Sequence, residues 1–181
     1  MTLYFITGNK NKFEEVKAIF KNVDQLNISL IEIQDIDPKN IIKAKLLEAK
    51  KHEKAEFIVE DTSLYLDCLN GLPGPLIKWF METIGNEGIY NLVKKLGNDK
   101  AEAKTIIRYS KNNEISFFEG SIKGKIVQPI AKSNFGWDPI FQANGYSKSF
   151  AEMDREEKNA ISMRRIALNK LKDFLDDNKK L

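Results

Sequence analysis

Several kinds of residue and segment are scarce in this 181-residue chain, and each scarcity excludes a class of protein. Cys68 is the one cysteine, so no intrachain disulfide can form and a secreted fold held by disulfides is excluded. His52 is the one histidine, which argues against a histidine-based metal site or a catalytic triad. No apolar run approaches the ~20 residues that span a bilayer, and the chain does not start like a secretory signal. We therefore expect a cytoplasmic protein with no membrane partner.

A large excess of one sign of charge is also absent, because the formal net charge is only +3. The basic residues are scattered among acidic ones, so we expect no nucleic-acid partner, although a basic cleft that collects phosphates is compatible with this pattern. The hydrophobic share of 42% and the charged share of 30% are typical of a globular protein. Without repeats, low-complexity segments or a linker, we expect residues 1–181 to form one domain with two lobes.

The order of the predicted elements favours an α/β fold. Hydrophobic patterning predicts strands at residues 3–6, 27–33, 57–59, 105–109 and 115–127. It predicts helices from the first turn to about Phe20, from Pro38 to Ala49, on both sides of Gly85, and from Glu156 to Leu175. Asn112-Asn113 is typical of a hairpin turn, which adds antiparallel pairing to the early parallel units. We therefore predict a mixed, twisted sheet flanked by helices.

The first strand ends in Thr7-Gly8-Asn9-Lys10-Asn11-Lys12, the most informative turn of the chain. A strand that turns at glycine into a helix directs backbone N–H groups and the positive end of the helix dipole toward one place. Such a place suits a phosphate, and Lys12 would add a point charge for a polyphosphate. The same residue types also occur at turns for conformational reasons alone, so both interpretations stay open at this point.

A second candidate site follows the apolar segment 57–59, where Glu60 and Asp61 are adjacent. Neighbouring carboxylates on a strand point to opposite faces, so one can face a ligand while the other packs. Carboxylates are preferred ligands of Mg²⁺, although Asp61 would equally suit a helix cap. Glu32 is a further candidate carboxylate that would also suit a solvated strand edge. Lys43 and Lys45 would face phosphates or lie on an exposed helix surface.

The segment Phe135–Pro139 places Gly136 between two aromatic residues, Phe135 and Trp137. Aromatic rings stack on nucleobases at about 1–3 kcal/mol per base, and Asp138 would accept a hydrogen bond from a base edge. Aromatic-rich segments also pack in cores, so this pattern alone leaves both roles open. Near the last predicted helix, Arg164 is either a bidentate donor to carbonyl or phosphate oxygens or a solvated surface charge.

Five motifs of this chain occur in an order that resembles one enzyme family. They are Thr7-Gly8-Asn9 with Lys12, Val59-Glu60-Asp61-Thr62, Gly71-Leu72-Pro73-Gly74-Pro75 with Ile77-Lys78-Trp79-Phe80, Phe135-Gly136-Trp137-Asp138-Pro139, and Ala151-Glu152-Met153 with Lys158-Asn159-Ala160, Ser162 and Arg164. Together they resemble the inosine triphosphate pyrophosphatases, also called the noncanonical purine NTP or XTP/dITP pyrophosphatases. The resemblance covers roughly residues 3 to 175.

The resemblance implies a mixed α/β fold of two lobes with the active site in a cleft between them, and usually a homodimer. It implies hydrolysis of deaminated purine nucleotides such as ITP, dITP and XTP to the monophosphate and pyrophosphate. The implied cofactor is Mg²⁺, with Mn²⁺ as an alternative. The implied partner is therefore a small-molecule nucleotide.

The resemblance also implies roles for individual residues. Metal binding is implied for Glu32, Glu60 and Asp61, and Asp61 would either bind the metal or activate the attacking water. Catalysis is implied for Asp61, Lys12 and Glu32. Nucleotide binding is implied for Thr7, Gly8, Asn9, Lys10, Asn11, Lys12, Lys45 (with Lys43 as a rival), Phe135, Gly136, Trp137, Asp138, Lys158, Met163 and Arg164.

One position departs from the family pattern, because Met163 stands where the family has histidine between serine and arginine. Methionine offers only a soft apolar contact, so base selectivity is the property most exposed to this change. One alternative is therefore a pyrophosphatase of broadened or pyrimidine-directed specificity, which a nucleotide panel would distinguish. Another is a nucleotide-sensing or RNA-binding module, which would bind ITP without Mg²⁺-dependent turnover.

Overall fold

The computed structural model describes residues 2–28, 33–52, 56–111, 114–130 and 136–178. Its helices are α1 (Lys10–Lys17), α2 (Pro38–His52), α3 (Ile77–Thr83), α4 (Gly85–Leu96), α5 (Arg155–Ile161) and α6 (Met163–Asp177). Its strands are β1 (Leu3–Ile6), β2 (Val23–Leu26), β3 (Glu56–Leu66), β4 (Pro73–Gly74), β5 (Lys100–Lys111), β6 (Glu114–Ile126) and β7 (Phe141–Ala143). Within these ranges, no helix has both the length and the apolar character needed to cross a bilayer.

The strands of the described residues form one sheet of seven, in the order β2-β1-β3-β5-β6-β7, with β4 paired to β3. β1 pairs in parallel with β2 and with β3. β4 pairs antiparallel with β3, and β7 pairs antiparallel with β6. The predicted α/β fold with a mixed sheet is therefore confirmed.

Contacts within the chain divide it into two compact units. Unit 1 consists of Met1–Asp61, Thr105–Gly120 and Met163–Leu181, and unit 2 consists of Thr62–Lys104 and Ser121–Ser162. β3, β5 and β6 contribute residues to both units, so the chain passes from one to the other several times. Two such units are compatible with the predicted pair of lobes, and the cleft between lobes stays a prediction.

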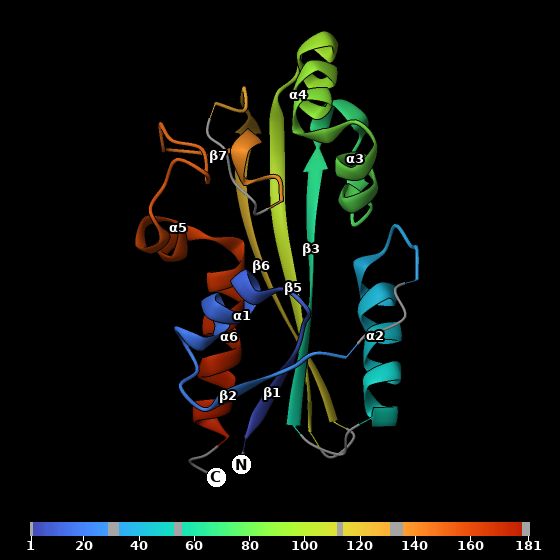
Figure 1. Ribbon diagram of the computed structural model, residues 1–181, viewed down its shortest axis with the longest axis vertical. Coiled ribbons are helices and arrows are strands. Elements are labelled where there is room, and N and C mark those ends of the chain that lie inside the picture. Colours follow the sequence, from blue (N-terminus) through green and yellow to red (C-terminus); the bar gives the residue numbers. More distant parts are fainter. Residues whose placement is uncertain (1, 29–32, 53–55, 112–113, 131–135, 179–181) are drawn as a thin grey trace. The chain divides into compact units, whose positions relative to one another are not determined.

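In unit 1, helices cover both faces of the sheet (Figure 1). On one face, Val16 of α1 and Leu168 of α6 pack in a core cluster that includes Ile58 of β3. On the other face, Ile42 of α2 packs in a second cluster with Val59 of β3. Ile58 and Val59 are consecutive, so the alternation of side chains along β3 directs them to opposite helical layers.

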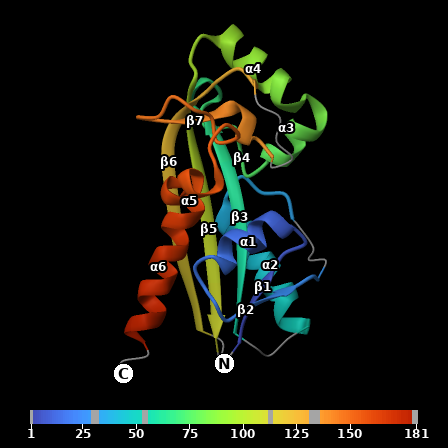
Figure 2. The ribbon, with the colours of Figure 1, turned by 60° about the vertical axis from the view of Figure 1, so that its left-hand side comes forward.

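Gly120 of β6 allows α6 to lie closely against the strand, and both views show the two elements side by side (Figures 1 and 2). A Cβ atom at Gly120 would overlap the backbone carbonyl oxygen of Met163 and would lie 2.7 Å from the backbone nitrogen of Ala167. Only glycine permits this approach. The first turn of α6, which carries Arg164, is therefore held directly against β6.

Two predicted strands differ from the structure. The strand predicted at residues 27–33 is wrong for the described part of that range, because Asn27, Ile28 and Ile33 lie outside any strand. The strand comes earlier, as β2, because Val23 is buried and pairs with Leu3 of β1. The strand predicted at 57–59 is longer, since β3 continues to Leu66 and carries Glu60 and Asp61 within it rather than after its end.

The predicted helices differ at two ends. α1 stops at Lys17 rather than near Phe20. The single helix predicted from Glu156 to Leu175 is two helices, because Ser162 adopts an extended conformation with ψ 148° between them. Serine is a favoured residue immediately before a helix, where it competes with the regular backbone bonding pattern. The prediction of two helices on both sides of Gly85 is confirmed by α3 and α4.

Candidate active site

The turn between β1 and α1 has the geometry of a capped helix N-terminus. The Asn9 side chain accepts a hydrogen bond of 3.1 Å from the backbone N–H of Lys12, and the Thr7 hydroxyl accepts one from the N–H of Asn9. Gln25 of β2 donates to the carbonyl oxygen of Thr7, which ties the turn to the sheet. Lys10 and Asn11 begin α1 as exposed residues. The turn is therefore bonded to β2 at Thr7, while Lys10 and Asn11 face solvent.

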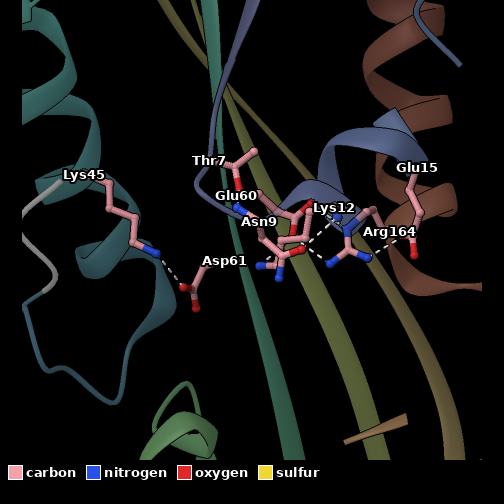
Figure 3. A network of polar contacts seen from close by, with 8 residues as sticks. All are labelled: Thr7, Asn9, Lys12, Glu15, Lys45, Glu60, Asp61 and Arg164. Carbon is pink, nitrogen blue, oxygen red and sulfur yellow. Dashed lines mark hydrogen bonds and ion pairs between the residues drawn. The ribbon is translucent and has the colours of Figure 1, made fainter. Parts of the chain in front are cut away.

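Glu60 and Asp61 lie on β3 just beyond the last pairing of β3 with β1, which joins Phe5 to Ile58. They therefore lie beside the turn at Thr7 in the same unit. Their side chains point to opposite faces of the sheet, as the alternation along a strand requires. Figure 3 shows Glu60 turned toward Lys12 and Arg164, and Asp61 turned toward Lys45.

Glu60 is held by two cations on the α1 and α6 side of the sheet. The Nε and Nη2 atoms of Arg164 donate to its two carboxylate oxygens at 2.7 and 2.9 Å, and the Lys12 ammonium lies 3.1 Å from Oε1. Burial acts to raise the pKa of Glu60, but the charges and hydrogen bonds of Arg164 and Lys12 outweigh it and hold that pKa well below its usual range. Glu60 is therefore an ionised anchor for both cations.

Arg164 is almost fully buried, with 1% of its surface exposed. Besides Glu60, its Nη1 donates to Glu15 of α1. Burial acts to lower the pKa of Arg164, but Glu60 and Glu15 raise it further above its usual range. Its guanidinium bridges two buried carboxylates, and the predicted contact of Arg164 with a nucleotide stays a prediction. Met163, the preceding residue, is buried as well.

Glu15 was not predicted as a member of the site. It lies three residues after Lys12 on α1, a spacing that places both side chains on the same side of the helix. Glu15 is buried next to the core residue Val16, which is an unusual position for a carboxylate. A charged residue on the apolar face of a short helix indicates a buried ion pair, and this was the available signal for Glu15. The sequence does not identify its partner, Arg164, which lies 149 residues away.

Asp61 is held on the α2 side of the sheet by Lys45. The Nζ of Lys45 lies 3.0 Å from Oδ1 of Asp61, with 10% and 15% of the two side chains exposed. Lys45 lies three residues after Ile42, so it extends the buried face of α2. Lys43 is exposed. Of the two lysines predicted as rivals, Lys45 is the one that the structure brings to the candidate site.

A pocket of about 250 Å³ lies between the turn at Thr7, Lys45 of α2 and Glu60 of β3 in unit 1. Its lining residues are Ile6, Thr7, Gly8, Asn9, Lys12, Ile28, Lys45, Val59 and Glu60. The pocket thus combines the capped turn, two lysine ammonium groups and a wall formed by β3. Because two lysines and the turn at the N-terminus of α1 line it, an anionic ligand is the chemistry that it suits.

The described residues offer part of a site for a divalent cation. No group of three histidine, cysteine, aspartate or glutamate side chains that could hold a metal ion is present among them. Glu32 lies outside the described residues, so its predicted role stays a prediction. Both oxygens of Glu60 contact cations of the protein, and its predicted metal role stays a prediction. Asp61 suits such a role, since Mg²⁺ often binds through one or two carboxylates and completes its shell with water and substrate phosphates.

Unit 2 contains the other predicted nucleotide-binding residues, and Phe135 lies outside the described range. Trp137 is 6% exposed and packs against Phe141 and Phe150, with ring centroids 5.5 and 6.4 Å apart. Asp138 forms a buried ion pair of 2.5 Å with Lys158. The Trp137 ring thus serves packing over most of its surface, and its predicted contact with a base stays a prediction.

Gly136, next to this aromatic cluster, has a positive φ of 61°. Its carbonyl oxygen accepts a hydrogen bond from the side-chain amide of Asn86. The left-handed conformation favours glycine and makes the sharp bend that the sequence predicted.

Comparisons with known proteins identify relatives of this chain. The inosine triphosphate pyrophosphatase of Schizosaccharomyces pombe is 38% identical over 98% of this chain and 97% of its own length. That of Aspergillus fumigatus is 41% identical over 97% of this chain and 95% of its own length.

Solved structures share the fold. The Ham1 protein of Staphylococcus aureus superposes with a TM-score of 0.81 at 28% identity, covering 98% of this chain and 100% of that one. The HAM1 protein of Coxiella burnetii has a TM-score of 0.84 at 22% identity with the same coverage, and supports the fold alone. The model of the Ham1 family matches residues 3–174. With its fold, its capped turn and its paired carboxylates in place, this chain belongs to the Ham1 family.

Proposed function

We propose that this protein is a hydrolase that cleaves noncanonical purine nucleoside triphosphates, such as ITP, dITP and XTP, into the monophosphate and pyrophosphate. The observation that carries the proposal is the pocket of unit 1, where the capped turn, Lys12 and Lys45 converge beside Asp61. The relatives named inosine triphosphate pyrophosphatase, which align over nearly the whole chain, support the same substrate class.

In this proposal, the turn from Thr7 to Lys12 binds the triphosphate. The backbone N–H groups at the start of α1 and the Lys12 ammonium stabilise the negative charge that develops on the departing pyrophosphate. Glu60 keeps Lys12 in position through the ion pair of 3.1 Å. Since Arg164 fixes Glu60 in turn, Arg164 acts as a positioning residue rather than as a contact to the nucleotide.

Asp61 is the carboxylate that we propose for the divalent cation, together with Glu32 and the substrate phosphates. When bound, Mg²⁺ would orient the phosphates and lower the pKa of the attacking water. The Lys45 ammonium faces Asp61, and a carboxylate must be deprotonated to act as a metal ligand. Water attacks the α-phosphorus and gives up a proton to solvent, the bond from the α-phosphorus to the oxygen that bridges to the β-phosphate breaks, and pyrophosphate leaves with that oxygen.

Base selectivity is proposed for Gly136, Trp137, Asp138 and Lys158, with Phe135 beside them. Met163 offers no hydrogen bond in place of the family histidine, so discrimination between 6-keto and 6-amino purines depends on the remaining groups. We propose that the preference for ITP over ATP is retained but reduced.

A nucleotide panel tests the function. Purified protein is assayed for pyrophosphate release from ITP, dITP, XTP, GTP, ATP and the pyrimidine triphosphates, with Mg²⁺ or with a chelator. We expect Mg²⁺-dependent release of pyrophosphate and monophosphate, fastest with the deaminated purines. Equal rates with all bases would favour the broadened-specificity alternative. Binding of ITP without turnover would contradict the proposal and favour a nucleotide-sensing module.

The same panel with Met163→His addresses selectivity. Restoring one hydrogen bond to the substrate is worth about 1 kcal/mol, so the ITP to ATP rate ratio should rise by roughly fivefold or more. An unchanged ratio would show that position 163 has little weight in base choice.

We also propose that the protein works in the cytoplasm as a homodimer. Light scattering of the purified protein measures the assembly, and fractionation of the source cells measures the compartment. A monomeric mass at working concentrations would contradict the assembly, and recovery in a membrane or extracellular fraction would contradict the compartment.

A further inference from the structure

The pair formed by Lys45 and Asp61 places a cation of the protein on the carboxylate proposed for the metal. The Nζ of Lys45 and the Oδ1 of Asp61 are 3.0 Å apart, and both side chains are largely removed from solvent. A lysine ammonium and a divalent cation cannot both occupy the same face of one carboxylate without strong repulsion, which grows where water is excluded. Lys45 and the metal therefore compete for Asp61.

The surrounding charges favour Lys45 over a divalent cation that arrives without a nucleotide. In the network drawn in Figure 3, the carboxylates of Glu15, Glu60 and Asp61 each contact a cationic side chain. Lys12 and Lys45 both line the pocket. A divalent cation that arrived alone would add positive charge to a group of side chains that already balance one another.

A triphosphate changes the balance, because it carries more negative charge than one divalent cation neutralises. The Lys45 ammonium is a strongly hydrated point charge on a flexible four-carbon stem, so it can turn from a carboxylate to a phosphate without movement of its helix. Such a turn would release the Oδ1 atom of Asp61 to the metal when the phosphates arrive.

We infer that Lys45 is a resident counter-cation of Asp61, which admits a divalent cation only together with a nucleoside triphosphate. Lys45 leaves Asp61 for the phosphates as the metal takes its place. The inference rests on the proposed function, since it assumes a metal–triphosphate substrate. It adds that the nucleotide-free protein resists metal binding and that a lysine of α2 imposes this order.

A purely structural role of Lys45 predicts something different. If the pair served only to stabilise the fold, its removal would lower stability and leave Mn²⁺ affinity unchanged. Under the inference, loss of the lysine charge lowers stability without metal and raises the affinity for a bare cation.

The test measures Mn²⁺ binding to the nucleotide-free protein by electron paramagnetic resonance of the free ion. Lys45→Met removes the charge and keeps much of the side-chain length, and Lys45→Arg keeps the charge. Lys39→Met, an exposed position on the same helix, is the matched control. We expect Lys45→Met to bind Mn²⁺ at least tenfold more tightly than wild type, with Lys45→Arg and Lys39→Met close to wild type. Adding Asp61→Asn to Lys45→Met should abolish the gain.

Two measurements guard against a variant that folds poorly. Thermal unfolding should show that Mn²⁺ raises the Tm of Lys45→Met more than that of wild type. The wild type itself should bind Mn²⁺ at least tenfold more weakly without nucleotide than with a nonhydrolysable triphosphate. Tight Mn²⁺ binding to nucleotide-free wild type, or equal affinity of wild type and Lys45→Met, would overturn the inference. Pyrophosphate release is assayed in parallel, so that loss of the order of binding is distinguished from failure of the proposed reaction.

Discussion

Glu60 and Asp61 are adjacent on β3, yet the two faces of the strand give them different surroundings. On the α1 and α6 side, Glu60 belongs to a buried network in which Arg164 binds it through two nitrogen atoms. On the α2 side, Asp61 contacts the Lys45 ammonium, and Lys45 lines the pocket. The comparison separates a carboxylate that holds the site together from one that, in the proposed mechanism, exchanges a lysine for a metal. Removing each group should therefore damage a different property.

The largest effect is expected for Asp61→Asn, which would remove the exchangeable carboxylate. Pyrophosphate release from ITP should fall by about a thousandfold, because the amide cannot replace a charged metal ligand, and this corresponds to about 4 kcal/mol in the barrier. The Tm should change by only a few degrees. Asp24→Asn, the same change at an exposed carboxylate of unit 1, is the control. Turnover near the wild-type rate would remove Asp61 from its role.

A different property should fail in Arg164→Met. Removing the guanidinium leaves Glu60 and Glu15 buried without their shared partner, so the free energy of unfolding should fall by about 3 kcal/mol. Urea denaturation followed by circular dichroism measures the change. Lys172→Met, on the exposed side of α6, should change it little. A loss comparable to that of the control would mean that the network contributes nothing to stability and would break the comparison.

The smallest effect concerns acid stability and Glu60→Gln. The pKa of Glu60 in the folded protein lies below its ordinary value of 4.5, so protons bind the unfolded chain more readily. The contribution of Glu60 to the free energy of unfolding is therefore complete above about pH 4.5 and is lost as the pH falls below this value. The wild type should lose stability more steeply than Glu60→Gln in this range, by up to about 1.4 kcal/mol per pH unit for one proton. Parallel curves from urea denaturation at several acidic pH values would contradict the assigned pKa.

Sequence reasoning succeeded where the chemistry is local. The turn from Thr7 to Lys12 needs only its neighbours, since Asn9 caps α1 and the strand before it is short. The opposite orientations of Glu60 and Asp61 follow from the period of a strand. The resemblance favours Lys45 over Lys43, and the three-residue spacing of Lys45 from Ile42 explains why it faces inward.

What the sequence does not reveal has physical causes that no short window contains. The bond between Arg164 and Glu15 joins residues 149 positions apart, so the burial of this arginine cannot be predicted from its neighbours in the sequence. The break at Ser162 is invisible in the apolar pattern, which continues across it. Trp137 illustrates a further difficulty, because a ring that packs on Phe150 and a ring that stacks on a base have the same sequence signature.

Gly120 has no reactive side chain, yet it determines whether the beginning of α6 can lie against β6. A methyl group there would collide with the carbonyl oxygen of Met163 and push the beginning of α6 off the strand. Arg164 would move with the helix, and Glu15 and Glu60 would remain buried without this arginine. When variants of this protein are interpreted, a change from glycine to alanine at position 120 should be ranked with damage to the site itself, although 44 residues separate it from the arginine it supports.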